Sequence, residues 1–323
     1  MKPWLWLPPK WSHSMAPTLL PLATLFSSKT PIHWRSFQWN GMEFINPLGI
    51  AGGVDKEGYS LLHWQHLGAG FLEVGTITPK AQAPNPGLII DRDHKSFSLW
   101  NKMGFPNAGA DSAKAHLLKI APKIKVPLFI NIGKNRDTEN KNALNDYISA
   151  LKTLNECGKT FVINISSPNT SGLRDLQHKD QLKYLLAGVR QAAPEKTLLL
   201  KLSPDMSNDQ LKECLDLGIQ ENMNGFILTN TTLQRLSSLP YPNMEGGVSG
   251  EPLKFLSRQA LLTAITHLGE SKNNLLIVSA GGILDSEEVK WRLDHGANLI
   301  QVYAALVYDG PFFFRNVVKK LWQ

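Results

Sequence analysis

Eight short apolar runs recur along this chain of 323 residues, and each is followed directly by polar or glycine residues. Runs of four or five apolar residues are typical of buried strands. Stretches with helical periodicity separate most of them, for example residues 144–157, 180–193 and 207–217. Strands that alternate with helices predict parallel βαβ units. The runs occupy residues 47–51, 70–74, 126–130, 160–163, 197–200, 225–228, 275–278 and 299–302.

The number of runs and their spacing predict an α/β chain folded as a (β/α)8 TIM barrel. Eight strands within about 260 residues match that fold in count and size. An open, doubly wound sheet is the alternative that the alternation alone leaves open. The polar residues favour the barrel, because the carboxyl ends of barrel strands meet on the one face where active sites are assembled.

Glycine, lysine and amide side chains at these strand ends are the first candidate site residues. Gly52, Gly53 and Lys56 follow the first run. The glycines allow a ligand to approach the backbone closely, and the lysine supplies a cation for an anionic substrate. Asn131 follows the third run, and Lys201 ends the fifth. A buried ammonium group is costly without a partner, so Lys201 is expected either to serve the site or to extend to solvent.

Two glycine clusters, at residues 246–250 and 279–283, predict a phosphate site near the last two strands. Barrels commonly bind phosphate there through backbone amides. Either cluster alone would indicate a turn, and residues 101–107 indicate a loop. A phosphate anchor with amides and a lysine suits flavin mononucleotide (FMN), whose anionic reduced form a nearby lysine stabilises. The sequence predicts no metal site, because no His/Asp/Glu cluster appears, and no serine hydrolase, because it lacks the G-x-S-x-G motif.

The segment FVINISSPNTSGLR, residues 161–174, places two adjacent serines at the end of the fourth run. Strand alternation puts Asn164 and Ser166 on one face, which favours Ser166 as the residue that points inward. The strand is ending, however, and Pro168 holds Ser167 in an extended conformation. The pattern therefore leaves both hydroxyl groups as candidates.

The first 42 residues predict a segment that lies on a membrane. They contain no Asp or Glu and five of the nine tryptophans. Aromatic rings with scattered cations suit a lipid interface, and the net charge of +7 suits an anionic lipid surface. Residues 15–26 are too few to span a bilayer and include Pro17 and Pro21. A cleaved signal peptide, or tryptophans that pack on the protein body, are the alternatives. Nucleic acid is disfavoured, because the segment is rich in tryptophan rather than arginine.

In combination, the motifs resemble those of the dihydroorotate dehydrogenases, in particular the membrane-associated, quinone-dependent class. The resemblance covers residues 46–311. It rests on the segments NPLGIAGGVDKEG, GTITPKAQAPNP, NKMGF, NIGKN, NISSPNTSGLR, TNTT, GGVSGEPL and GANLIQVYAAL. It implies a flavoprotein oxidoreductase that uses FMN to oxidise (S)-dihydroorotate to orotate in de novo pyrimidine biosynthesis, the route to UMP, and passes the electrons to a membrane quinone.

The same resemblance implies a division of the chain and a location. Residues 1–40 would associate with the membrane and form the quinone tunnel, and residues 41–323 would form the FMN-binding catalytic barrel. The protein would be a monomeric peripheral membrane protein on the cytoplasmic face of the inner cell membrane, or on the mitochondrial inner membrane in a eukaryote.

The resemblance also implies the roles of individual residues. Ser167 would be the base that removes a C5 proton while C6 delivers hydride to the flavin. His13 and Arg92 would belong to the quinone site. FMN would contact Ala51, Gly52, Gly53, Thr76, Asn131, Asn164, Lys201, Thr229, Gly250, Gly282, Tyr303 and Ala304. Dihydroorotate would contact Lys56, Asn101, Lys102, Met103, Gly104, Phe105, Asn164, Asn169, Asn230 and Thr231.

The base distinguishes the two classes of the family. The soluble class uses a cysteine where this chain has Ser167, and neither Cys157 nor Cys214 falls in that loop. Oxidation with fumarate or a nicotinamide-linked acceptor is therefore the disfavoured enzymatic alternative. A basic barrel that binds lipid without catalysis is the alternative of a different kind.

The chain departs from the family pattern at a few positions. Lys102 stands where arginine is usual, Pro106 where asparagine is usual, and Ala304 where serine or threonine is usual. The N-terminal extension is shorter than usual and contains Pro8 and Pro9. The short extension and its prolines bear on the first helix of the quinone tunnel, and Ala304 leaves only a backbone amide for the phosphate.

Overall fold

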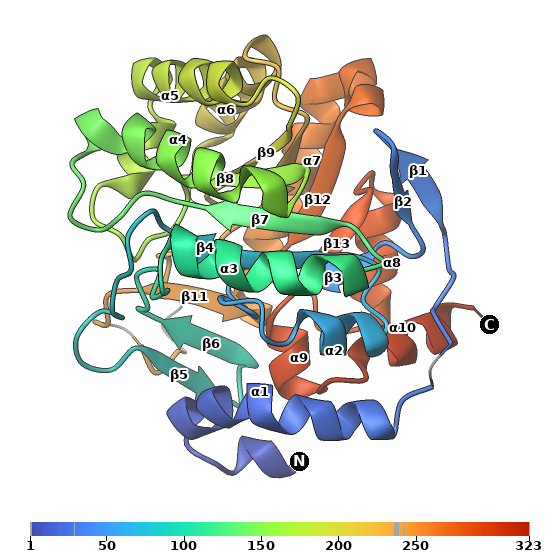
Figure 1. Ribbon diagram of the computed structural model, residues 1–323. Coiled ribbons are helices and arrows are strands. Elements are labelled where there is room, and N and C mark those ends of the chain that lie inside the picture. The colour runs from blue at the N-terminus through green and yellow to red at the C-terminus, as the bar shows by residue number, and fades with distance from the viewer. Residues whose placement is uncertain (1, 29, 236–238, 242, 323) are drawn as a thin grey trace.

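The centre of the molecule is a closed barrel of eight parallel strands (Figure 1). The computed structural model describes residues 2–28, 30–235, 239–241 and 243–322. The strands follow the order β3-β13-β12-β10-β9-β8-β7-β4, and a parallel bridge between Gly49 and Phe71 closes the ring. The barrel prediction is confirmed, and the open sheet is excluded. The strands are β3 (Leu48–Ile50), β4 (Leu72–Ile77), β7 (Leu128–Ile132), β8 (Thr160–Asn164), β9 (Thr197–Leu202), β10 (Gly225–Leu228), β12 (Leu276–Ala280) and β13 (Leu299–Val302).

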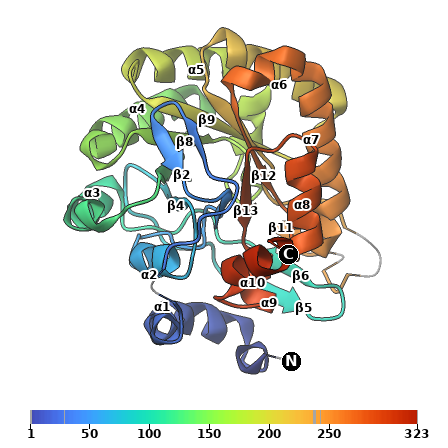
Figure 2. The ribbon, with the colours of Figure 1, turned by 90° about the vertical axis from the view of Figure 1, so that its right-hand side faces the viewer.

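Helices surround the barrel and alternate with its strands (Figure 2). The three predicted helical stretches correspond to α4, α5 and α6. Helix α6 begins with a capping box, in which Ser207 and Gln210 satisfy each other's backbone amides. The helices between and after the strands are α2 (Leu61–His66), α3 (Ala110–Ile120), α4 (Ala143–Leu154), α5 (Lys179–Ala192), α6 (Asn208–Gln220), α7 (Lys254–Leu268), α8 (Ser286–Asp294), α9 (Ala304–Tyr308) and α10 (Phe313–Leu321).

A hairpin fills the amino-terminal end of the barrel with aromatic rings. Its strands are β1 (Phe37–Trp39) and β2 (Met42–Phe44). The ring of Phe44 packs edge-on against Phe71 and Phe129 inside the barrel. Because this end is filled, the opposite end, where the strands finish, is the one that can hold a ligand.

A second sheet of three antiparallel strands stands beside the carboxyl ends of the barrel strands. It consists of β5 (Ile90–Asp93), β6 (Ser98–Asn101) and β11 (Gly247–Gly250), in the order β11-β6-β5. The glycine cluster at residues 246–250 forms a strand, because Gly247–Gly250 pairs with β6 from far away in the sequence. Asn101 ends a strand and does not lie in a loop.

The N-terminal segment forms a short turn and one helix that lie outside the barrel, below α2 and β5 in Figure 1. The 3-10 turn η1 (Pro3–Leu5) occupies the place of the expected first tunnel helix, and α1 (Pro9–Leu25) continues through Pro17 and Pro21. In the described part of the chain, no helix is both long and apolar enough to cross a bilayer.

The tryptophans of the first 42 residues differ in how far they are buried. Trp34 and Trp39 pack against apolar clusters of the protein body, as the alternative interpretation predicted. Trp6 and Trp11 are exposed, by 76% and 63%. Trp4 is half-buried, and its indole donates to the Val307 carbonyl at 2.7 Å. Only the exposed pair is available to a lipid surface.

Candidate active site

A cavity opens at the carboxyl ends of the barrel strands, next to the β5-β6-β11 sheet. Most of the candidate site residues line it, although they come from every part of the chain. Those that line it are Ala51, Gly52, Gly53, Lys56, Thr76, Asn101, Met103, Gly104, Phe105, Asn164, Ser167, Asn169, Lys201, Thr229, Asn230, Thr231, Gly250, Gly282, Tyr303 and Ala304.

Two of the candidates for contact with FMN or substrate do not reach the cavity wall. Asn131 is fully buried, and its amide donates to Glu73 at 2.6 Å while its oxygen accepts from Asn164 at 3.2 Å. It therefore supports the cavity from below. The ammonium of Lys102 pairs with the exposed carboxylate of Glu245, and neither residue lines the cavity.

Beneath the cavity lies a buried ion pair that the sequence analysis did not find. The Nζ atom of Lys201 lies 3.2 Å from Oε1 of Glu73, and neither side chain is more than 6% exposed. Glu73 is the partner that a buried lysine requires. It escaped notice because it interrupts an apolar run by a single residue, yet a lone carboxylate inside such a run is itself a signal for a buried partner.

Two amides complete the surroundings of Glu73. Asn131 donates to Oε1, and Gln301 donates to Oε2. Gly52 covers the group from above, since a Cβ atom at that position would lie 2.2 Å from Oε1 of Glu73. The backbone of residues 51–53 can thus lie directly over the pair, and the ammonium of Lys201 faces the cavity.

The structure distinguishes between the two serines. The hydroxyl of Ser166 donates to Oδ1 of Asn164 at 3.0 Å and accepts from the amide of Asn230 at 3.0 Å. Ser166 is fully buried and is committed to this network. Ser167 lines the cavity, and its Oγ accepts only the backbone amide of Asn169, at 3.2 Å, among the contacts described. Ser167 is therefore the hydroxyl that a ligand in the cavity can meet.

Several polar atoms around the cavity are buried and have no partner within the described protein. They are Nε1 of Trp100, Oδ1 of Asn169, Oγ1 of Thr231 and Oε1 of Gln301. A buried polar atom without a partner costs about 1–3 kcal/mol. A ligand with amide and carbonyl groups, such as a pyrimidine or a flavin ring, would satisfy such atoms.

Lys56 supplies the second cation of the cavity. Its ammonium donates to the Gly53 carbonyl at 3.1 Å. Burial lowers the pKa of Lys56 to about 8, and the neighbouring Asp55 partly opposes that shift. Asp55 itself accepts the amides of Gly58 and Ser60 and fixes the turn that carries the lysine.

One end of the cavity is formed by glycine backbone, at Gly250 and Gly281–Gly282. The carbonyl of Gly281 is held from behind by the hydroxyl of Ser257 at 2.7 Å and the guanidinium of Arg292 at 3.2 Å. Arg292 is buried and pairs with Glu288 at 2.6 Å. A glycine loop fixed in this way presents backbone rather than side chains to the cavity, as a phosphate site requires.

A second, largely apolar cavity adjoins the first. Helix α1, the η1 turn, α9 and strand β5 form its walls, and Ile90, Leu99 and Tyr303 line both cavities. Arg92 lies at its edge, where its guanidinium donates to the carbonyls of Trp4 and Leu5 and thereby ties the N-terminal segment to β5. His13 belongs to α1, but its side chain lies outside the described residues.

No group of three or more His, Cys, Asp or Glu residues in the described ranges is arranged to hold a metal ion. The polar cavity offers lysines, amides, hydroxyl groups and glycine backbone as its chemical groups.

Comparison with known proteins identifies the family. The model of the dihydroorotate dehydrogenase family matches residues 36–323. The chain belongs to the dihydroorotate dehydrogenase family. A relative from Thermus thermophilus, named dihydroorotate dehydrogenase (quinone), is 44% identical over 281 residues, which is 86% of this chain and 80% of the relative.

Two further dihydroorotate dehydrogenases extend the comparison. One from Sulfurimonas denitrificans, also named as the quinone enzyme, is 38% identical over 100% of this chain and 93% of its own. The solved structure of DHODH from Eimeria tenella in complex with ferulenol has a TM-score of 0.89 and 31% identity, and covers 97% of this chain and 90% of that chain. The N-terminal segment, which precedes the family match, thus has an aligned counterpart in the Sulfurimonas enzyme.

Proposed function

We propose that this dihydroorotate dehydrogenase oxidises (S)-dihydroorotate to orotate with bound FMN and passes the electrons to a membrane quinone, as a step of pyrimidine biosynthesis. The observation that carries the proposal is the arrangement of the two cavities. A serine, rather than a cysteine, lines the polar cavity, and an apolar cavity suited to a lipid-soluble acceptor adjoins it through Ile90, Leu99 and Tyr303.

The polar cavity fits FMN. The glycine backbone at Gly250 and Gly282, with the start of α9 at Ala304, would hold the phosphate, and Ala304 would contribute its backbone amide only. Lys201 and the amide of Asn164 would face the ring, while Asn131 would support them from below. When bound, FMN supplies the acceptor for two electrons and one proton.

The remaining polar groups would hold the substrate. Lys56 would pair with the carboxylate of dihydroorotate, and the amides of Asn101, Asn169 and Asn230 would meet its ring amides. Asn169 donates to Oδ1 of Asn101 at 2.7 Å, so these two side chains orient each other. The unpartnered oxygens of Asn169 and Thr231 support this assignment, because a ligand would satisfy them. Met103, Gly104 and the ring of Phe105 would complete the wall.

Ser167 would act as the base. It takes the proton from C5 of dihydroorotate as the hydrogen at C6 leaves with its electron pair, and the C5–C6 double bond of orotate forms. A hydroxyl group is a weak base in water, so the step requires a closed site and a fixed geometry. The near-complete burial of Ser167 supports the first requirement.

The apolar cavity would receive the quinone, with Arg92 at its polar edge, and His13 would be the second residue of the quinone site. The outer face of η1 and α1 would rest on an anionic lipid surface, because it exposes Trp6, Trp11 and Phe26 (83% exposed) and bears no acidic residue. We place the protein as a monomer on the cytoplasmic face of the cell membrane, or on the mitochondrial inner membrane if the source is eukaryotic.

The proposed boundary between the membrane segment and the barrel lies a few residues earlier than residue 40. A boundary between residues 40 and 41 would cut the β1–β2 hairpin, which packs inside the barrel. The proposed quinone and membrane segment therefore ends before Phe37.

The test compares Ser167→Ala with Ser166→Ala. General base catalysis contributes about 10²–10⁴-fold, so Ser167→Ala should slow bleaching of the flavin by dihydroorotate to that extent while FMN stays bound. Ser166→Ala controls for the loss of a neighbouring hydroxyl and should have a smaller effect. Undiminished bleaching in Ser167→Ala would remove the serine from the mechanism.

The second half-reaction tests the acceptor. The reduced protein is mixed with a short-chain quinone, fumarate or a nicotinamide cofactor, and reoxidation is followed by the return of flavin absorbance. The proposal expects fast reoxidation by the quinone. Fast reoxidation by fumarate alone would assign the chain to the soluble chemistry, and a colourless protein that binds vesicles would support the non-catalytic alternative.

A further inference from the structure

An arginine and an aspartate outside the cavity join the loops that carry the candidate catalytic and substrate-binding residues. The loop after β8 carries Ser167 and Asn169, and the loop after β10 carries Asn230 and Thr231. Between them lies the loop after β9, which holds Asp205. Neither Arg174 nor Asp205 lines the cavity.

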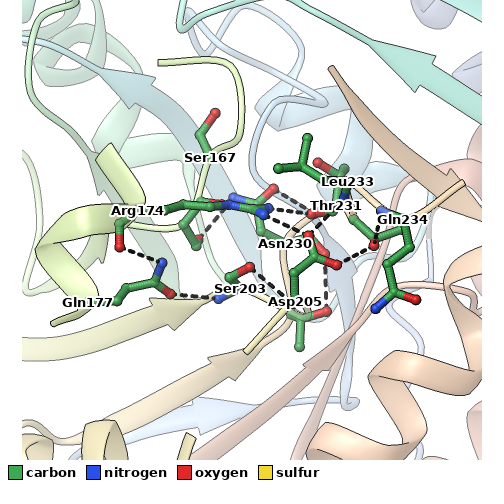
Figure 3. Close-up of polar contacts among 12 residues, drawn as sticks. Ser167, Arg174, Gln177, Ser203, Asp205, Asn230, Thr231, Leu233 and Gln234 are labelled. Carbon is green, nitrogen blue, oxygen red and sulfur yellow. Dashed lines mark hydrogen bonds and ion pairs between the residues drawn. The ribbon is translucent and has the colours of Figure 1, made fainter. Parts of the chain in front are cut away.

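Arg174 donates in three directions from one guanidinium group (Figure 3). Its Nε donates to the carbonyl of Ser166 at 2.9 Å, Nη1 to Oδ2 of Asp205 at 2.6 Å, and Nη2 to the carbonyl of Thr231 at 2.7 Å. The first acceptor belongs to the peptide that leads directly into Ser167. The third belongs to a residue that lines the cavity.

Asp205 ties the same loops together from the opposite side. Its Oδ2 accepts the backbone amide of Leu233 at 2.7 Å, and its Oδ1 accepts the hydroxyl of Thr232. Both partners follow Thr231 directly in the chain. Figure 3 shows Asp205 between Arg174 and the segment that contains Leu233 and Gln234.

Gln177 adds a further link between the loops after β8 and β9. Its amide donates to the carbonyl of Arg174 at 3.2 Å, and its oxygen accepts the amide of Ser203 at 3.1 Å. The side chains of Arg174 and Asp205 are only 17% and 16% exposed, so the ion pair is largely shielded from solvent.

We propose that Arg174 and Asp205 are positioning residues, which fix the hydroxyl of Ser167 relative to Asn230 and Thr231. This inference rests on the proposed function and names no group that touches the substrate. The fork of the guanidinium is essential to it, because its three nitrogens are spread over a plane and each reaches a separate acceptor. An ammonium has the same charge, but its three donors leave a single nitrogen and cannot span acceptors that lie so far apart. Displacement of a reacting group by about 1 Å can cost about 10²-fold in rate.

The test measures flavin bleaching by saturating dihydroorotate in Arg174→Met, Arg174→Lys and Asp205→Asn. We expect about a 10–100-fold loss of the bleaching rate in all three. The dissociation constants of orotate and FMN should change less than about fivefold, and reoxidation by quinone should be unchanged. Substrate deuterated at C5 should show a larger isotope effect than in the unaltered enzyme, because proton removal is the step that slows.

Arg190→Met is the matched control. Arg190 also holds several backbone carbonyls, among them those of Lys196 at 2.9 Å and Asn222 at 2.6 Å, but at the amino-terminal end of the barrel. The Arg190→Met variant should have a lower melting temperature but the same bleaching rate and isotope effect as the unaltered enzyme.

The possible results distinguish a failure of the proposed clamp, the ion pair of Arg174 and Asp205, from a failure of the proposed function. If dihydroorotate does not bleach the unaltered enzyme, the proposed function fails. If it does, recovery of the rate in Arg174→Lys, or an isotope effect equal to that of the unaltered enzyme, overturns the clamp. A loss of rate matched by an equal loss of orotate affinity also overturns it. Should Arg174→Met not fold, Asp205→Asn decides, since asparagine keeps one oxygen acceptor for the amide of Leu233 and its NH2 group can donate to the hydroxyl oxygen of Thr232.

Discussion

The buried ion pair of Glu73 and Lys201 allows the effect of a single substitution on thermal stability to be predicted. Glu73→Gln leaves the ammonium of Lys201 buried without its counter-charge, in a place where its side chain is 6% exposed. Removal of one partner from a buried pair costs about 3–5 kcal/mol. With an unfolding entropy of about 2.1 cal/mol/K per residue and 323 residues, the melting temperature should fall by about 4–7 °C.

The reverse change, Lys201→Met, should destabilise the protein comparably, because it leaves the carboxylate of Glu73 with only two neutral amides. The double variant removes both charges together and should lose less than the sum of the single losses. Thermal unfolding with saturating FMN gives the stability of the unaltered protein, the two single variants and the double variant. Losses that add within about 0.5 kcal/mol would show that the two residues do not interact as a unit.

The same variants should move the flavin reduction potential in opposite directions. Glu73→Gln leaves a net positive charge beside the cavity and favours the reduced, anionic ring, so the potential should rise. Lys201→Met leaves a net negative charge, so the potential should fall. A shift of about 30 mV is a tenfold change for two electrons, and spectral titration against reference dyes resolves it. Shifts of the same sign would refute the electrostatic reasoning.

Three further outcomes are expected. Because the pKa of Lys56 is about 8, its charge is present below that pH and is lost above it; the orotate dissociation constant, measured spectrally, should rise about tenfold by pH 9, and Lys56→Met should remove this dependence. Lys102→Ala should change the KM for dihydroorotate less than about threefold, since its ammonium pairs with Glu245 outside the cavity at an exposed site. Replacement of Trp6 and Trp11 by serine should weaken co-sedimentation with anionic vesicles while flavin bleaching is retained, and equal sedimentation would contradict the proposed lipid face.

The barrel could be predicted because its strands are buried on both sides. Such strands appear as continuous apolar runs, and all eight were recognised with errors of a few residues at their ends. The small sheet could not be found in this way. Strand β5 is mostly charged and β6 mixes polar and apolar residues. Strand β11 is rich in glycine and pairs with a strand nearly 150 positions away, with Gly247 opposite Asn101.

The site was predicted in outline because its residues stand at strand ends. Contacts between side chains inside the barrel could not be predicted in the same way. Glu73 lies within a strand, and its partner Lys201 comes from another strand, so local pattern could not join them. The choice between Ser166 and Ser167 required the hydrogen bonds that commit one hydroxyl and leave the other at the cavity wall.

The wall formed by Ile90, Leu99 and Tyr303 is a single layer of side chains, since the same residues line both cavities. If the proposed function holds, dihydroorotate, a water-soluble acid, reacts on one side of this wall. The quinone, a lipid-soluble oxidant, reacts on the other side, so the two molecules never meet. The wall would keep the substrate and the quinone apart, while electrons would cross it from one cavity to the other. A compound that fills the lipid-side chamber should therefore stop turnover without competing with the acid, and its potency should depend on membrane composition rather than on substrate concentration.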